Sequence, residues 1–180
     1  MLRKIVCLLL LVLGLGLMPP HSRAAYSALG QPAPPFEIKS GQDQKLTLEM
    51  VRGKIVVLFY EDRQVVDKND ALKDELTRLY QVQSESIKKE IFRLVVIDCS
   101  KATFPTLAIW KHQLAQHSQA LGFTIYGDWN RRMLLDYGME KNDSNFLIID
   151  KNGIIRYSST GKINQREIEN IKNLLISLAH

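Results

Sequence analysis

The stretch IVVLFYEDRQVVDKND, residues 55–70, decides the fold of this chain of 180 residues. Its first five residues are apolar without interruption, which is typical of a strand covered on both faces of a parallel sheet. A second apolar run at 94–97 predicts a parallel partner strand, reached by a right-handed crossover. The segment between the two runs predicts a helix, because apolar side chains recur at helical spacing at Leu72, Leu76, Leu79 and Tyr80.

The C-terminal third predicts a β-hairpin followed by a helix. Apolar runs at 146–150 and 154–158 flank a turn that ends at Gly153, where glycine can adopt a positive φ. Asn164 and Glu167 have the spacing of a capping box, which marks the first turn of a helix. The apolar face of that helix comprises Ile168, Ile171, Leu174, Leu175 and Leu178.

Shorter elements complete the predicted domain. Segments 36–38 and 46–48 flank a polar turn and predict an N-terminal β-hairpin. The middle of the chain predicts a helix over 105–120, a strand over 123–126 and a helix over 130–137. All these elements together predict an α/β fold whose central mixed β-sheet is flanked by helices.

The N-terminus predicts export. Two basic residues precede an apolar run of 14 residues at 5–18, and small residues follow up to Ala24. This pattern is typical of a signal peptide over 1–24, and the run is shorter than the roughly 20 residues that span a bilayer. We therefore expect no stable membrane span after cleavage. Residues 25–35 predict an extended lead-in, and 36–180 a single domain.

Charge and cysteine content argue against two features, nucleic-acid binding and an internal disulfide. Removal of residues 1–24 takes away three of the 24 basic residues and no acid, so 21 basic residues remain beside 19 acids. Such a balance does not favour nucleic-acid binding. Cys99 is the only cysteine after residue 24, so the mature chain can form no internal disulfide.

Three motifs resemble the redoxin branch of the thioredoxin-like superfamily, which contains peroxiredoxins and TlpA-like proteins. Residues 30–36 (GQPAPPF) resemble its Gly-x-x-Ala-Pro-x-Phe opening. Residues 53–54 (GK) resemble the lead-in to its first long strand, and 146–155 (FLIIDKNGII) resemble its late hairpin. The stretch from Asp128 onward is most similar to YtfJ-type periplasmic proteins. The resemblance implies a thioredoxin-like fold and a periplasmic location.

The chain departs from this family at the redox site. The resemblance places Gln64 and Asp67 where a Cys-x-x-Cys pair would stand. It also places Ser144 and Asn145 where relatives carry a cis-proline, and we expect trans peptide bonds there because a non-proline cis bond costs about 2.5–4 kcal/mol. Both changes fall on the same corner and predict that redox chemistry has been lost.

Cys99 offers an alternative chemistry. It follows a predicted strand whose carboxyl end should lie beside Glu61, Asp62 and Arg63. A thiol activated by Arg63 or Lys101 could act in a peroxidase or oxidoreductase that uses an external thiol. An inert cysteine at a strand end is the favoured interpretation, since the neighbouring Asp98 disfavours a thiolate.

No cofactor or metal site is predicted. The acids at 61, 62, 67 and 70 could attract a divalent cation, but stabilisation of a helix N-terminus explains them better. His112 and His117 are five residues apart and lack the spacing of a helical zinc pair. Trp110 is expected in the core, whereas Trp129 follows a loop and is expected to be exposed.

These observations favour an exported, redox-inactive protein with a thioredoxin-like fold that binds another exported protein or a peptide. A homodimer with a structural role is a further possibility. The groove that holds peptides in redox relatives should persist here, lined by Tyr60, Glu61, Asp62, Arg63, Gln64, Trp129, Ser144 and Asn145.

Overall fold

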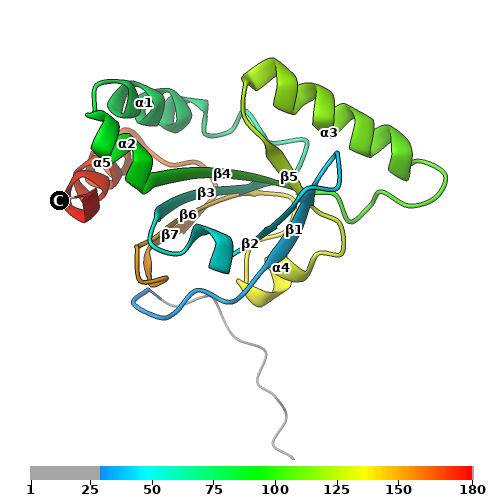
Figure 1. Ribbon diagram of the computed structural model, residues 1–180, viewed down its shortest axis with the longest axis horizontal. Helices are drawn as coiled ribbons and strands as arrows, with labels where there is room; N and C mark the ends of the chain where they lie inside the picture. Colours follow the sequence, from blue (N-terminus) through cyan, green and yellow to red (C-terminus); the bar gives the residue numbers. More distant parts are fainter. Residues whose placement is uncertain (1–28, 180) are drawn as a thin grey trace, which may run out of the picture.

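A computed structural model describes residues 29–179 of the chain, and the predicted signal peptide lies outside this range. Figure 1 shows a central sheet with helices on both faces. The strands are β1 (Glu37–Ser40), β2 (Lys45–Thr47), β3 (Ile55–Glu61), β4 (Ile91–Asp98), β5 (Ile125–Asp128), β6 (Ser144–Ile149) and β7 (Ile155–Thr160). The helices are α1 (Asp70–Gln81), α2 (Glu85–Glu90), α3 (Leu107–Leu121), α4 (Arg132–Asp136) and α5 (Gln165–Ala179), with a short 3₁₀ helix, η1 (Glu49–Val51).

The seven strands form one mixed sheet in the order β2-β1-β5-β4-β3-β6-β7. β3 pairs in parallel with β4 and antiparallel with β6, and all seven of its residues are buried. β4 pairs in parallel with β5, which pairs antiparallel with β1. The uninterrupted apolar run of β3 therefore reflects its central position, as predicted.

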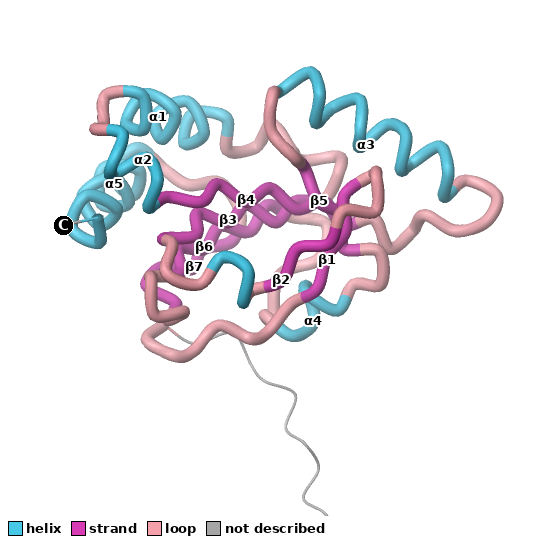
Figure 2. The backbone as a smooth tube through the Cα atoms, in the orientation of Figure 1, coloured by secondary structure: helices cyan, strands magenta, loops and turns pink. Residues whose placement is uncertain are grey.

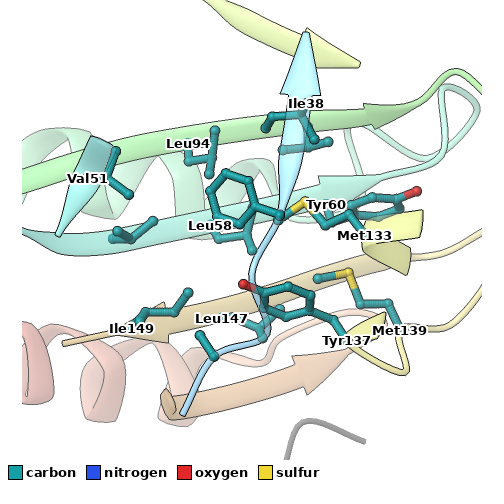
Figure 3. Packing of buried hydrophobic residues seen from close by; sticks show 14 of the residues in the cluster. Ile38, Val51, Leu58, Tyr60, Leu94, Met133, Tyr137, Met139, Leu147 and Ile149 are labelled. Carbon is teal, nitrogen blue, oxygen red and sulfur yellow. The ribbon is translucent and has the colours of Figure 1, made fainter. Parts of the chain in front are cut away.

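The helices divide between the two faces of the sheet (Figures 1 and 2). Helices α1 and α5 pack on one face over β3 and β6, and α3 packs on the same face over β5. Helix α4, η1 and the segment before β1 cover the other face. Figure 3 shows the core on that second face, where Leu58, Tyr60 and Leu94 meet Met133 and Tyr137.

Two motifs predicted from local sequence, the turn at Asp150 and the capping box at Asn164, are confirmed by hydrogen bonds between nearby residues. The Asp150 carboxylate accepts hydrogen bonds from the backbone N–H groups of Asn152 and Ile154, and Gly153 has a φ of +80°. In the capping box, the N–H of Asn164 donates to Glu167 and the N–H of Glu167 donates to the Asn164 side chain.

Several predicted boundaries are wrong. Strand β4 begins at Ile91, because its pairing with β3 continues through Arg93. Helix α2 was not predicted, and α3 begins at Leu107 instead of 105. Strand β5 and helix α4 each begin two residues later than predicted. The single cis peptide bond within residues 29–179 joins Phe104 to Pro105, so the predicted trans bonds at 144 and 145 are confirmed.

Candidate functional site

The carboxyl end of β3 carries a buried ion pair. Glu61 is 1% exposed, and its carboxylate lies 3.0 Å from the Lys73 ammonium group on α1. The Ser144 hydroxyl donates to the other carboxylate oxygen over 3.0 Å, and it accepts a bond from the Asn69 amide. Burial raises the pKa of Glu61, although Lys73 and Ser144 oppose this shift. These groups tie β3, α1 and β6 together.

The side chain of Asn145 also forms its hydrogen bonds inside the protein. Its side-chain oxygen accepts from the backbone N–H of Glu140 and from the Thr160 hydroxyl, at 2.9 and 3.0 Å. Its amide donates to the carbonyls of Glu140 and Tyr60, at 2.9 and 3.4 Å. Asn145 is 1% exposed. The residue at the expected cis-proline position thus connects the strands and the preceding loop.

This burial corrects the predicted peptide groove. Tyr60, Glu61, Asp62, Ser144 and Asn145 are all buried, so their side chains do not form an accessible surface. Their polar groups form hydrogen bonds inside the protein instead, at the ends of β3, β5 and β6. Of the residues predicted around β3, only Arg63 and Gln64 are exposed.

The loop after β3 begins with a tight turn. The Asp62 carboxylate accepts from the backbone N–H of Gln64 and lies 3.5 Å from the Lys101 ammonium group. The Arg63 guanidinium lies 5.2 Å from the ring centre of Trp110 on α3, in a cation–π arrangement. Trp110 is half-buried and packs against the cluster of Cys99, Leu114 and Ile125, so its predicted place in the core is confirmed only in part.

Cys99 lies beside this loop, as the sequence predicted, but it is 1% exposed. Burial raises the pKa of its thiol to about 12, and the carboxylates of Asp98 and Asp128 add to the shift while Arg63 opposes it. A reactive cysteine needs an accessible thiol with a lowered pKa. The environment of Cys99 has the opposite character.

Asp98 and Asp128 end the adjacent strands β4 and β5. Asp98 forms an ion pair of 3.1 Å with Arg131. Asp128 accepts from the Tyr60 hydroxyl and from the backbone N–H of Leu134, both at 3.1 Å. Burial raises the pKa of Asp128, although these two bonds oppose the shift. This second buried network fixes α4 against the sheet.

Trp129 does not join the predicted groove. It is half-buried, its indole N–H donates to the carbonyl of Lys39 on β1 over 2.9 Å, and its ring packs close to Gly127. Trp129 also packs against the hydrophobic cluster around Cys99 and Leu114. Trp129 therefore anchors β5 to β1, and its predicted exposure is only partial.

A large groove opens next to these networks, between α1 and α3. We call it the α1–α3 groove and define it by Tyr80, Val95, Ile97, Trp110, Leu121 and Phe123. It has a volume of about 570 Å³, within the range typical of ligand sites. Arg63 and Cys99 border one end, and Ile91 borders the other. The groove therefore follows the length of β4.

The groove exists because the helices leave β4 uncovered on one face. Leu94 and Val96 face the other side of the sheet and are buried, whereas Val95 and Ile97 are only partly buried and Arg93 is exposed. Arg93 is the residue from which the sequence could have indicated this uncovered strand face. A charged residue next to the apolar run indicates that one face of the strand is not covered by the core.

Residues 29–179 bring together no three His, Cys, Asp or Glu side chains that could hold a metal ion. Within the same residues, none of the helices has the length and apolar character required to cross a bilayer.

The mixed sheet and its two helical layers define a thioredoxin-like α/β protein. The model of the AhpC/TSA family matches residues 29–158, and the chain belongs to this family. The expected redoxin resemblance is thus confirmed. A comparison with curated proteins gave no match.

Three solved structures illustrate the similarity of the fold. A candidate thiol:disulfide interchange protein DsbE from Chlorobium tepidum is 17% identical with a TM-score of 0.61, covering 85% of this chain and 99% of its own. A thiol peroxidase from Chromobacterium violaceum is 15% identical with a TM-score of 0.58, covering 86% and 89%. An exposed lipoprotein thioredoxin from Streptococcus pneumoniae is 17% identical with a TM-score of 0.54, covering 78% and 99%.

Proposed function

We propose that this protein is a redox-inactive member of the AhpC/TSA family that is exported to the periplasm and binds a partner protein or peptide in the α1–α3 groove. The observation that carries the proposal is the groove itself, an apolar hollow of about 570 Å³ that the helices of this chain leave open. Contiguous apolar surface of this kind marks interaction sites in soluble proteins. Export rests on the sequence of residues 1–24 and on the resemblance to YtfJ-type periplasmic proteins.

The chemistry of the redox corner supports a binding role. Gln64 and Asp67 carry no sulfur, and the family's usual thiol chemistry therefore has no group at these positions. The alternative, a one-thiol enzyme, needs Cys99 as a thiolate. Cys99 is only 1% exposed, and burial raises the pKa of its thiol to about 12, which is the opposite of the accessible, low-pKa thiol that such an enzyme needs. Binding is the better supported of the two functions.

A matched pair of surface leucines tests this proposal. Leu121 borders the groove and is 58% exposed, whereas Leu135 on α4 is 55% exposed on the opposite face of the sheet. Both can be changed to serine without opening the core. We suggest selecting displayed 18-residue peptides on the purified protein and measuring their affinity for both variants.

The proposal predicts peptides that bind the wild type and the Leu135→Ser variant equally. Leu121→Ser should weaken them about fivefold or more, because it removes an apolar side chain of the groove, and fivefold corresponds to about 1 kcal/mol. A selection that yields no binder, or only binders that Leu121→Ser leaves unchanged, would overturn the proposal.

A further inference from the structure

The floor of the α1–α3 groove is a single strand with an unusual residue in it. Arg93 projects from β4 on the same face as Val95 and Ile97. Its guanidinium lies 4.9 Å from the ring centre of Tyr80 and 5.5 Å from that of Phe123. The two aromatic rings hold the cation at the groove surface.

Arg93 has no anionic partner within the described part of the chain. Among residues 29–179 its guanidinium contacts the rings of Tyr80 and Phe123, and no carboxylate lies within ion-pair distance. A second cation, Arg63, lies over Trp110 at one end of the groove. Glu61 is the only acid among the described lining residues, and Lys73 already pairs with it. The lining therefore offers positive charge to a ligand.

The position of the groove favours a helical occupant. β4 is hydrogen-bonded to β3 on one side and to β5 on the other, so the groove offers a sheet face and no free sheet edge. An extended peptide would gain no ladder bonds there, whereas a helix satisfies its own backbone groups. The eight residues of β4 span roughly 26 Å, which corresponds to a helix of about 18 residues.

We propose that the α1–α3 groove takes an amphipathic helix of the partner, with an Asp or Glu side chain at the edge of its apolar face that pairs with Arg93. The inference rests on the proposed function and specifies its partner. The apolar face of the helix covers Val95, Ile97 and Phe123, and completes the helical layer between α1 and α3. A carboxylate beside a guanidinium stacked on aromatic rings gains a charge-assisted hydrogen bond away from bulk water.

The charge of the groove argues against the chain's own N-terminal segment as the occupant. Residues 1–28 contain three basic residues and no acid, so their charge has the same sign as that of Arg63 and Arg93. A partner helix that carries an acid is complementary to the groove in both its apolar face and its charge.

A double-mutant cycle tests the pairing. The peptides are those of 18 residues selected above, each compared with a version whose central acid is changed to its amide. Each is measured against the wild type, Arg93→Gln and the control Arg132→Gln. Arg132 is an exposed arginine on α4, across the sheet from the groove.

We expect apolar residues at i, i+3, i+4 and i+7 in the selected peptides, and a helical circular dichroism spectrum in the complex. Arg93→Gln should weaken acidic peptides about tenfold, which corresponds to about 1.4 kcal/mol, and the amide versions much less, because only the carboxylate pairs with the guanidinium charge. Arg132→Gln should leave the affinity of both the acidic peptides and the amide versions unchanged.

The failures of the two proposals are distinguishable. Peptides that depend on Leu121 but are extended, lack an acid or ignore Arg93→Gln would overturn this inference and leave the binding function intact. If no selected peptide depends on Leu121, both the binding function and this inference are overturned. Two findings would assign the groove to another occupant and overturn the inference: a dimer in sedimentation that Leu121→Ser dissociates, or a bound single-chain lipid in native mass spectrometry.

Discussion

Asn145 uses all of its hydrogen-bonding capacity inside the protein. Each polar atom of its side chain has two partners, and these partners belong to β3, β7 and the loop before β6. At the same corner, Glu61 and Ser144 hold α1 through Lys73 and Asn69. At residue scale, the corner around Asn145 is a set of satisfied polar contacts, so substitutions there should act on stability.

Replacing Asn145 by alanine should therefore destabilise the fold. We expect a loss of at least about 2 kcal/mol in the free energy of unfolding, because buried groups left without a partner cost about 1–3 kcal/mol each. The exposed Gln64 provides the control, and Gln64→Ala should stay within about 0.5 kcal/mol of the wild type. Urea unfolding at neutral pH measures both. Equal stability of the two variants would contradict the structural role of Asn145.

Glu61 should make stability depend on pH. Burial raises its folded-state pKa above the ordinary value of 4.5, so the native protein binds more protons than the unfolded chain between these two values. The free energy of unfolding contributed by Glu61 then falls as pH rises through this window, and stays low above it.

Glu61→Gln removes this titration. The wild-type free energy of unfolding minus that of Glu61→Gln should be largest near pH 4 and should decrease as pH rises above 4.5. Urea unfolding of both proteins from pH 4 to 8 measures the difference. A difference that grows with pH would mean that Lys73 outweighs burial and lowers the pKa.

At the scale of elements, α3 is held in place by a close approach to the β1–β2 turn. A Cβ atom on Gly41 would clash with the backbone of Lys111 and Ala115. Gly41→Ala should thus displace α3 and cost about 1–3 kcal/mol of stability, as overpacking does. Gln42 in the same turn is exposed, and Gln42→Ala should be nearly neutral. Chemical unfolding compares the two, and a neutral Gly41→Ala would show that the contact yields without cost.

The elements that could be predicted from the sequence depend on nearby residues. The turn at Asp150 and the capping box at Asn164 are satisfied within four residues, so their motifs were sufficient. β4 was predicted too short because Arg93 interrupts its apolar run. The structure tolerates this arginine because the strand face it occupies borders a groove.

The groove and the buried networks could not be predicted in the same way. Glu61 and Ser144 are 83 residues apart in sequence, and their contact depends on the antiparallel pairing of β3 with β6. Helix α3 is apolar on more than one face, with Leu114 buried and Ile109 exposed, so its spacing did not show which side meets the sheet. Trp110 was expected in the core because aromatic residues at helical positions are more often buried, and the spacing could not show that it lies at the edge of the groove.

For the whole molecule, packing supplies the stability of the described domain without help from an internal disulfide. The described domain holds one cysteine, and it is buried between β4 and α3. The chain's other cysteine is Cys7, in the predicted signal peptide, so a Cys7→Ser variant keeps Cys99 alone. Thermal unfolding of this variant should therefore give the same midpoint with and without a reductant. Cys99 in this variant should react with a thiol probe only after urea unfolding, because its native pKa lies near 12, above the ordinary 9.0. Rapid labelling of the native protein, or a midpoint that falls with reductant, would show that the thiol reaches solvent or a partner chain. Either result would restore Cys99 as a candidate for thiol chemistry.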